Sequence, residues 1–297
     1  MTMMISRRQA IAGTLLAVPT ITGLSTAVAA KSDGGALEGR LRTLEERHGG
    51  RLGVSIQNLA TGARLGHRAD ELFLMCSTSK ALLGGFILAR VDRGEEKLDR
   101  RIPVKKADLL DWAPVVGTRV GADMSVAELC EATITWSDNA AANILLASFG
   151  GPTVLTDFLR STGDGVSRLD RTEPTLNTHE GPDDERDTST PDAMLETLRK
   201  LVFGDVLSRR SKAQFATWLV MNKTGDTRIR AGFPDDWIAG DKTGTNGDTA
   251  GNANDVAIGW SPDRGAVLVV VFYEVPGISG DERNAVIAEV GRISVEV

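Results

Sequence analysis

The sequence predicts an α+β protein in which an antiparallel sheet, flanked by N- and C-terminal helices, adjoins an all-helical lobe. Strand patterns occur only towards the two ends of the chain, over residues 52–65 and 237–275, while the stretch between them has helical patterns. Strands from both ends must therefore meet in one sheet. We expect one lobe from residues 31–80 and 219–297 and an all-helical lobe from residues 81–218, with a functional cleft where they join.

The first thirty residues have the pattern of an export signal. Ser6-Arg7-Arg8-Gln9 precedes an apolar run from Ile11 to about Val28, and Ala27-Val28-Ala29-Ala30 supplies small residues for cleavage. The paired arginines indicate the twin-arginine route of bacteria. A membrane anchor is the alternative, but proline, glycine and hydroxyl residues make this a poor permanent span. We expect a cleaved leader at residues 1–30 and a periplasmic or secreted protein without stable membrane association.

Composition excludes several other classes. The 297 residues are 41% hydrophobic, which supplies a sizeable core, and the net charge of -6 argues against a nucleic-acid partner. His48, His67 and His179 show no metal-ligand spacing, so we expect no zinc site. Cys76 and Cys130 lie in stretches that we interpret as separate helices, so a bridge between them does not follow from the sequence. Two free, mostly buried thiols are the expected state. The expected state is a monomer.

The N-terminal elements follow from apolar spacing. Leucines at i, i+4 and i+7 predict an amphipathic helix over 37–48, which the two following glycines end. Alternation over 52–56 predicts a half-buried strand, and a turn at 60–62 leads into a second strand through Leu65. Residues 77–91 have a helical pattern and are nearly all apolar, so this helix should be buried on every side.

The sequence patterns predict that the middle of the chain, from about residue 81 to residue 218, is wholly helical. Its signals are a capping box at Ser125-Val126-Ala127-Glu128, a helical run over 139–149, Pro152 as the first residue of a helix, and a helix over 190–201. Residues 169–190 show no periodicity. A long loop of this kind inside a compact body is either functional or the sign of a wrong assignment.

Strand patterns return near the C-terminus. They cover 237–243, 255–260 and 266–275, with a hairpin turn at 261–265 between the last two. A terminal helix is predicted over 282–290.

Cys76-Ser77-Thr78-Ser79-Lys80 places a hydroxyl and an amine three residues apart at the start of a helix. Helical spacing of i and i+3 puts both side chains on one face. A serine beside an amine that can take its proton is an activated nucleophile. Taken alone, the pattern is explained equally well by a helix N-cap followed by a solvated lysine.

Three further motifs follow in order: Ser137-Asp138-Asn139, Glu173-Pro174-Thr175-Leu176-Asn177 and Lys242-Thr243-Gly244-Thr245. Alone, the first is most often a turn with an N-cap. Together with the Ser-x-x-Lys pattern, the set resembles the class A serine β-lactamases over essentially the whole mature length. The resemblance implies the serine β-lactamase/DD-peptidase-like fold and hydrolysis of β-lactam antibiotics without a cofactor or metal.

The resemblance implies a catalytic role for each motif. Ser77 would be the nucleophile, and Lys80 would take its proton if burial or the neighbouring Lys242 lowers the pKa of that amine. Ser137 would pass a proton to the leaving nitrogen, with Lys242 beside it. Glu173 would activate the water that breaks the acyl-enzyme. Whether Lys80 or Glu173 is the base for acylation is open.

The remaining implied site residues would bind substrate or solvent: Asn139, Asn177, Thr243, Thr245, Arg228 and Trp112. The oxyanion hole would come from the backbone amides of Ser77 and Thr245. Arg228 is assigned to the substrate carboxylate because Gly251 stands where several relatives carry an arginine. Trp112 would wall the cleft mouth, and its alternative is an ordinary, partly buried tryptophan.

Arg171 and Asp187 bracket the Glu173 loop and would tie its ends together; the alternative is a solvated surface pair. The loop after Asn177 is slightly longer than the family pattern, which leaves the places of His179 and Glu180 open. Asn246 could reshape the edge strand beside the substrate in a direction that the sequence does not predict. The preferred antibiotics are open as well.

Two other functions compete with hydrolysis. A penicillin-binding DD-peptidase shares three of the motifs but lacks the deacylating glutamate, and a non-catalytic β-lactam sensor would be membrane-tethered and keep its adduct. Glu173 together with Asn177 favours the hydrolase.

Overall fold

The structure is a computed structural model that describes residues 34–181 and 183–297. The predicted leader at residues 1–30 lies outside the described residues. The described residues belong to one compact unit, and the division into two lobes at residues 80 and 218 stays a prediction. None of the described helices is both long and apolar enough to cross a membrane.

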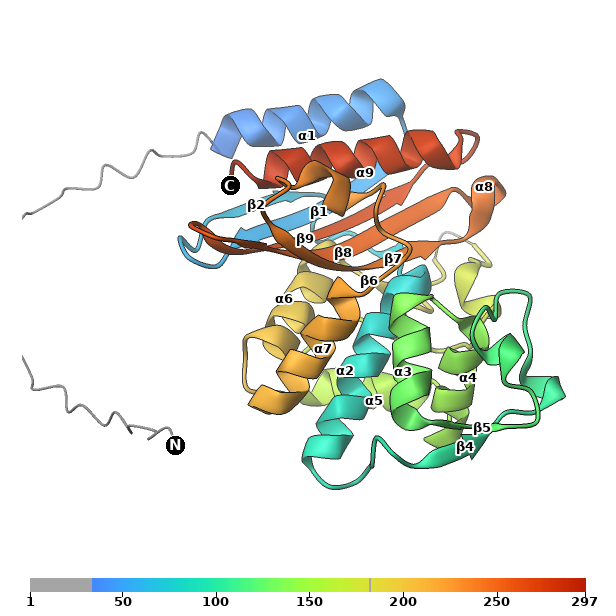
Figure 1. Ribbon diagram of the computed structural model, residues 1–297. Helices are drawn as coiled ribbons and strands as arrows, with labels where there is room; N and C mark the ends of the chain where they lie inside the picture. Colours follow the sequence, from blue (N-terminus) through green and yellow to red (C-terminus); the bar gives the residue numbers. More distant parts are fainter. Residues whose placement is uncertain (1–33, 182) are drawn as a thin grey trace, which may run out of the picture. The chain divides into compact units, whose positions relative to one another are not determined.

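A five-stranded antiparallel sheet forms the middle layer, with the strand order β2-β1-β9-β8-β7 (Figure 1). Its strands are β1 (Arg51–Asn58), β2 (Arg64–His67), β7 (Ile238–Thr245), β8 (Asn252–Ser261) and β9 (Gly265–Glu274). Strands from the two ends of the chain meet where β1 pairs with β9, with Leu52 opposite Tyr273. The predicted sheet is confirmed.

The sheet separates two hydrophobic cores. Helices α1 (Gly34–His48) and α9 (Gly280–Ser294) cover one face, and α6 (Pro191–Val202) and α7 (Arg209–Val220) pack on the other (Figure 1). Side chains alternate along β9, so that Val269 joins the core beneath α1 and α9 while Val270 joins the core of the helical side.

The prediction that β1 is half-buried was wrong, because both faces of this strand are covered. The residues on the face that was expected to be exposed are small enough to be buried. Gly53 lies against Phe73 and Pro191, and the Ser55 hydroxyl donates to Asp192 Oδ1 at 2.6 Å. A sheet packed on both sides needs no strictly alternating pattern.

Helix α2 (Ser79–Asp92) runs through the helical side, and its residues from Ser79 to Ala89 are buried, as predicted. A 3₁₀ turn, Cys76–Thr78, precedes it, so the regular helix begins two residues later than expected. The other helices of this side are α3 (Val126–Thr135), α4 (Asn139–Ser148) and α5 (Thr153–Ser161), and a four-residue helix α8 (Gly247–Ala250) follows β7.

The prediction that the middle of the chain is wholly helical was wrong in part. One pair of short strands, β4 (Arg101–Pro103) with β5 (Asp123–Ser125), lies within this stretch. A second pair joins β3 (Phe73–Leu74), which precedes the stretch, to β6 (Thr188–Ser189) inside it. Further 3₁₀ turns cover Lys106–Asp108, Val116–Thr118, Thr175–Asn177 and Ile229–Gly232.

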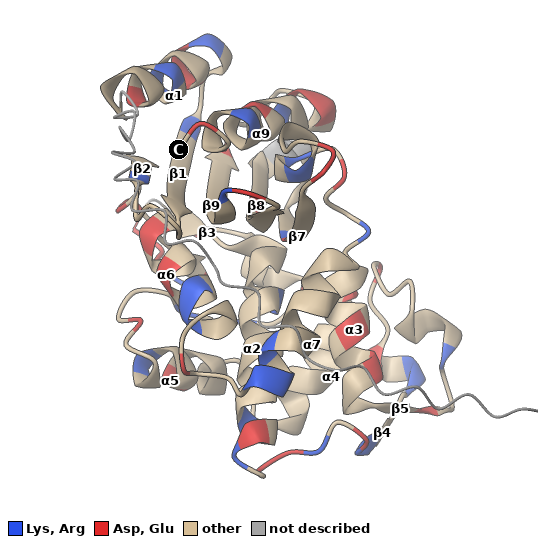
Figure 2. Ribbon diagram, turned by 60° about the vertical axis from the view of Figure 1, so that its left-hand side comes forward, with Lys and Arg blue, Asp and Glu red and all other residues tan. Residues whose placement is uncertain are grey.

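The helix starts follow local capping. The predicted capping box at Ser125 is confirmed, with its hydroxyl accepting from the Glu128 backbone N–H at 3.1 Å. Pro152 caps α5 and is not its first residue. On the surface, acidic and basic residues are interspersed along α1, α6 and α9 (Figure 2), and exposed ion pairs of this kind are each worth less than about 1 kcal/mol.

Candidate active site

Ser77 lies in the turn between β3 and α2, where Met75–Ser77 face strand β7. The approach is close: a Cβ added at Gly244 would lie 2.8 Å from the Met75 carbonyl oxygen and 3.1 Å from the Ser77 backbone nitrogen. Only glycine lets β7 come this near. The strand therefore brings Thr245, the next residue, to the side of the nucleophile.

Lys80 lies one turn beyond Ser77, as the helical spacing predicts. Its Nζ lies 2.9 Å from Ser77 Oγ, 2.8 Å from Glu173 Oε1 and 2.5 Å from Asn139 Oδ1, and the side chain is only 2% exposed. Burial lowers the pKa of the Lys80 amine, and the Glu173 carboxylate opposes this shift.

Ser137 and Lys242 form the opposite side of the centre. Lys242 Nζ donates to Ser137 Oγ at 3.1 Å, and Lys80 Nζ lies 3.4 Å from the same oxygen. Burial, together with the positive charge of Lys80, lowers the pKa of Lys242 well below its usual range. Ser137 Oγ is thus a hydroxyl in contact with two amines, which suits the transfer of a proton.

The Ser-Asp-Asn triplet is both a cap and part of the site. Asp138 caps α4 by accepting from the Ala141 backbone N–H at 2.9 Å, and its other oxygen accepts from the backbone N–H groups of Val115 and Val116, each at 2.9 Å. Ser137 has a left-handed φ of 54°. The buried Asp138 fixes this backbone turn. The side chains of its two neighbours, Ser137 and Asn139, therefore lie at the cleft.

Glu173 joins the centre from the irregular loop. Its Oε1 lies 3.3 Å from Ser77 Oγ, and its Oε2 accepts from Asn177 Nδ2 at 2.6 Å. Asn177 Oδ1 is buried without a hydrogen-bond partner in the part of the chain that the structure describes. An unpaired acceptor beside a carboxylate suits the binding of a water molecule.

Asn143 of α4 holds the backbone of Glu173 from behind. Its Nδ2 donates to the Glu173 carbonyl oxygen at 2.8 Å, and its Oδ1 accepts from the Glu173 N–H at 3.0 Å. The sequence did not point to Asn143, although it follows Asn139 by one helical turn and so shares its face.

The Arg171–Asp187 pair is confirmed, with Arg171 Nε 2.5 Å from Asp187 Oδ2. The alternative of a solvated surface pair was wrong, because Asp187 is fully buried. Its Oδ1 also accepts from the backbone N–H groups of Asp170 and Arg171, and its carbonyl accepts from the Met75 N–H at 3.0 Å. The loop is thus tied to the turn that carries the nucleophile.

Arg228 is buried and mostly satisfied by protein atoms. It donates to the Gly244 carbonyl at 2.9 Å, the Asn254 carbonyl at 2.7 Å, Asn284 Oδ1 at 2.8 Å and Thr245 Oγ1 at 2.7 Å. A guanidinium has five N–H donors, which leaves one for a ligand. Its positive charge therefore lies behind Thr245.

Thr224 is a site residue that the sequence did not reveal. Its hydroxyl lies 2.6 Å from Thr243 Oγ1 and 3.0 Å from Asn222 Oδ1, and Asn222 in turn donates to the buried Asp241 at 2.6 Å. The signal was hidden because Asn222 and Thr224 lie in an ordinary polar turn.

These groups line one cavity of about 340 Å³. Its lining residues are Ser77, Trp112, Ser137, Asn139, Glu173, Asn177, Thr224, Arg228, Thr243 and Thr245. Lys80 and Lys242 do not line it, but their amines contact the hydroxyls of Ser77 and Ser137, which do. The structure thus brings all eleven predicted site residues together, and the cavity has the size and polarity of a small-molecule site.

Known proteins are similar to this chain in sequence and in fold. The model of the β-lactamase enzyme family matches residues 36–297. The β-lactamase OXY-2 of Klebsiella oxytoca is 44% identical over 280 residues, 94% of each chain, and the β-lactamase L2 of Stenotrophomonas maltophilia is 47% identical over 269 residues, 90% of this chain and 86% of the relative. A solved ancestral class A β-lactamase has a TM-score of 0.85 and 56% identity, covering 88% of this chain and 99% of that one. The chain belongs to the class A β-lactamase family.

In this class A β-lactamase, Trp112 stands at the mouth of the cleft and is 53% exposed. Its Nε1 donates to the Trp136 carbonyl at 3.0 Å, and its own carbonyl accepts from the Asn139 N–H at 2.9 Å. Trp112 lines the cavity, and its role as an aromatic wall there stays a prediction beside the alternative of an ordinary, partly buried tryptophan.

The longer part of the loop is ordered by its own polar groups. His179 Nδ1 lies 3.0 Å from the Asp184 carbonyl oxygen, and the Glu180 N–H donates to Asp184 Oδ2 at 3.0 Å. Arg186 binds the carboxylates of both Asp184 and Glu180. His179 and Glu180 therefore lie in a surface turn and do not line the cavity.

Both cysteines of the β-lactamase are buried and unbridged, as predicted. Burial raises the pKa of the Cys76 thiol and of the Cys130 thiol.

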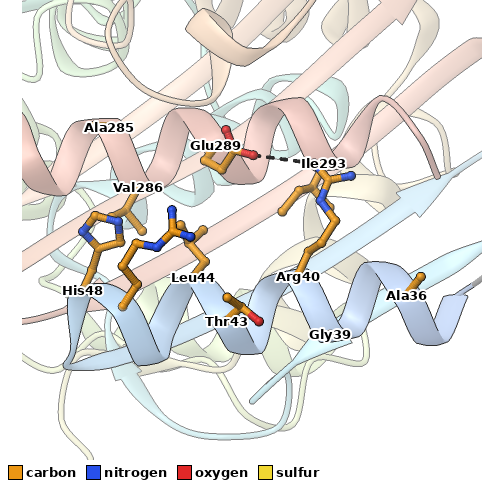
Figure 3. Close-up of a pocket in the computed structure, with 11 residues that line it drawn as sticks. Ala36, Gly39, Arg40, Thr43, Leu44, His48, Ala285, Val286, Glu289 and Ile293 are labelled. Carbon is orange, nitrogen blue, oxygen red and sulfur yellow. Dashed lines mark ion pairs between the residues drawn. The ribbon is translucent and has the colours of Figure 1, made fainter.

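A second, larger cavity of about 560 Å³ lies between α1 and α9 (Figure 3), and Arg40 forms an ion pair with Glu289 there at 3.5 Å. The motif residues do not line this cavity, so the larger of the two cavities is not the candidate active site.

Proposed function

We propose that this class A β-lactamase opens the β-lactam amide through an acyl-enzyme on Ser77, which a water activated by Glu173 then hydrolyses. β-Lactam hydrolysis is the activity of the family to which the chain belongs. The observation that carries the proposed roles is the triangle of Ser77 Oγ, Lys80 Nζ and Glu173 Oε1, whose sides are 2.9, 2.8 and 3.3 Å.

In acylation, Ser77 Oγ attacks the lactam carbonyl carbon and gives its proton to Lys80 or Glu173, both of which lie within hydrogen-bond distance. The backbone N–H groups of Ser77 and Thr245 stabilise the negative oxygen. The carbon–nitrogen bond then breaks, and the nitrogen receives the Ser137 hydroxyl proton. The neighbouring amine of Lys80 or Lys242 replaces that proton.

In deacylation, a water held by Glu173 and Asn177 attacks the ester carbonyl. Glu173 takes the water proton, the ester carbon–oxygen bond breaks, and the proton passes to Ser77 Oγ either directly from Glu173 or through Lys80. The unpaired Asn177 Oδ1 and the adjacent Glu173 carboxylate support this role. A DD-peptidase lacks this glutamate and a sensor keeps its adduct, so the pair favours the hydrolase.

Substrate binding is proposed for the remaining residues. Asn139 would bind the side-chain amide of the substrate, and Trp112 would cover it. Thr243 and Thr245 would bind the carboxylate, with the buried charge of Arg228 behind them.

Class A β-lactamases are periplasmic or secreted enzymes. We propose export through the twin-arginine route on the strength of Arg7 and Arg8 in the sequence. We further propose that the mature enzyme is a monomer.

The test is Glu173→Gln, with Glu180→Gln as a matched control, because Glu180 lies on the same loop and its side chain is 71% exposed. With a penicillin, we expect Glu173→Gln to accumulate an adduct on Ser77, seen by mass spectrometry, and to lose about 10²- to 10⁴-fold in kcat. Rapid turnover by this variant would refute the role of Glu173. A persistent adduct on the parent protein would instead indicate a DD-peptidase or a sensor.

A further inference from the structure

Asn246, at the end of β7, joins this strand to the loop that carries Glu173. Its Nδ2 donates to the backbone carbonyl of Asn177 at 3.0 Å. Asn177 in turn donates from its own Nδ2 to Glu173 Oε2 at 2.6 Å. The edge of the sheet is therefore two hydrogen bonds away from the carboxylate proposed to activate water.

The Asn246 side chain has a fixed orientation. Its Oδ1 accepts from the Asn252 backbone N–H at 2.8 Å, and its Nδ2 donates to Asn252 Oδ1 at 2.6 Å as well as to Asn177. An amide NH₂ group has two donors, and both are used here. Asn252 is itself 2% exposed at the start of β8. This double contact anchors Asn246 to the sheet, so the loop is held to a rigid element.

The loop is held from two sides at this point. Asn143 of α4 holds the backbone of Glu173, and Asn246 of the sheet holds the backbone of Asn177, four residues later. Between these points the backbone has only the 3₁₀ turn Thr175–Asn177 as regular structure. Catalytic geometry must be held to about 0.5 Å. Side-chain contacts from outside the loop therefore have to supply that precision.

We propose that Asn246 is a positioning residue for deacylation, which fixes Asn177 and through it the Glu173 carboxylate relative to the acyl-enzyme. The inference rests on the proposed role of Glu173 in deacylation. The inference also takes Lys80 as the base for acylation, so that this step uses Ser77, Lys80 and the backbone N–H of Thr245. The hydrogen bonds of the Asn246 side chain go to Asn177 and Asn252 and to none of these groups. Its loss should therefore slow the second half of the reaction and leave the first half intact.

This division has a distinct kinetic signature. In a two-step reaction kcat/KM reports only the steps through acylation, whereas kcat reports the slower of the two steps. Slower deacylation lowers kcat and KM together and leaves kcat/KM unchanged. A general loss of folding or of substrate affinity does not produce this pattern.

The discriminating variant is Asn246→Asp, which keeps the shape and the acceptor for the Asn252 N–H. It replaces the donor with an oxygen that faces the Asn177 carbonyl and Asn252 Oδ1. We expect kcat and KM for a penicillin to fall together by about 10- to 100-fold, with an adduct on Ser77 accumulating during turnover in rapid-quench mass spectrometry. Asn246→Ala, which removes the donor without adding charge, should show the same pattern.

Two further variants complete the experiment. Asn252→Ala should show the same pattern more weakly, because it removes the bond from Asn246 Nδ2 to Asn252 Oδ1 but keeps the backbone N–H that binds Asn246 Oδ1. Ser261→Ala, at the far end of β8, removes an exposed side-chain contact with Asp263 and should behave as the parent. Thermal melting of each variant shows that it is folded under the assay conditions.

Two results would overturn the proposal: kinetics of both Asn246 variants equal to those of the parent, or a fall in kcat/KM with no accumulated adduct. Failure of the proposed function is a separate result, since it would appear as rapid turnover by Glu173→Gln. A trapped adduct in Glu173→Gln together with parental kinetics in the Asn246 variants would refute only the positioning role. If an Asn246 variant does not fold, the Asn252→Ala result decides in the same way.

Discussion

The nucleophile and the Glu173 loop meet within 3.3 Å, yet different interactions hold them in place. Ser77 and Lys80 lie at the start of a buried helix, and the backbone of β7 packs directly against the turn that carries Ser77. The loop has little regular structure, and single side chains from remote parts of the chain hold it. Acylation thus depends on packing, whereas deacylation depends on individual hydrogen bonds. A substitution can remove the second function without disturbing the first.

Gly244→Ala should break the packed side of this comparison and have the largest effect. The new Cβ would lie 2.8 Å from the Met75 carbonyl oxygen, so β7 must shift and carry the Thr245 amide with it. We expect a loss of about 10²- to 10³-fold in kcat/KM, the scale for losing one oxyanion donor. Steady-state kinetics with a penicillin measures it.

The matched control is Gly39→Ala in α1, where an added Cβ meets nothing within 4 Å. This variant should keep full activity and gain slightly in helix stability. A kcat/KM of Gly244→Ala close to that of the parent would show that the packing of β7 does not set the oxyanion geometry.

Asn143→Leu should break the hydrogen-bonded side and have an intermediate effect. It leaves the backbone N–H and carbonyl of Glu173 without their partners, which costs about 1–3 kcal/mol of unfolding free energy. We expect kcat to fall about 10-fold or more, with adduct accumulation and a retained kcat/KM. Ala147→Gln, exposed on the same helix, is the control. Loss of kcat/KM equal to the loss of kcat would mean that Asn143 also serves acylation.

The smallest expected effect is the loss of stability in the Glu173 loop at acid pH, when Asp170 is protonated. Burial works to raise the pKa of Asp170, but hydrogen bonds from Arg168 and from the Asp187 N–H outweigh it and lower this pKa below 3.8. A lowered folded-state pKa gives stability that is present above the unfolded pKa and lost as pH falls through the folded one. We expect less than about 1 kcal/mol, because the pair is partly exposed.

Hydrogen exchange measures this effect. As pH falls from about 5 toward 2, amides of residues 170–187 should lose protection before those of the sheet, once the intrinsic pH dependence is corrected. Asp170→Asn should flatten the change, whereas Glu185→Gln, with a side chain 65% exposed on the same loop, should not. Simultaneous loss of protection in loop and sheet would contradict a separately held loop.

The sequence predicted the packed side of the site better than the hydrogen-bonded side. Ser77 and Lys80 share one helical turn, and Lys242 to Thr245 share one strand, so local spacing already places them. Asn143 and Asn246 act on residues 30 and 69 positions away through one or two hydrogen bonds. Local periodicity carries no signal for such contacts.

The same limit explains the errors in the fold. Spacing and apolar alternation predicted which segments are strands and helices, but burial of both faces of β1 depends on helices far along the chain. The short strand pairs β4–β5 and β3–β6 have two or three residues each, too few for a pattern of period two to stand out.

The two unbridged thiols have a consequence for how the enzyme matures. Since Cys76 and Cys130 are the only cysteines in the sequence, the fold requires no oxidising catalyst and loses nothing to reductants such as dithiothreitol. The thiol form, which burial favours in both residues, reacts poorly with disulfides and peroxides. Folding of this enzyme is therefore independent of the redox potential of the compartment in which it takes place.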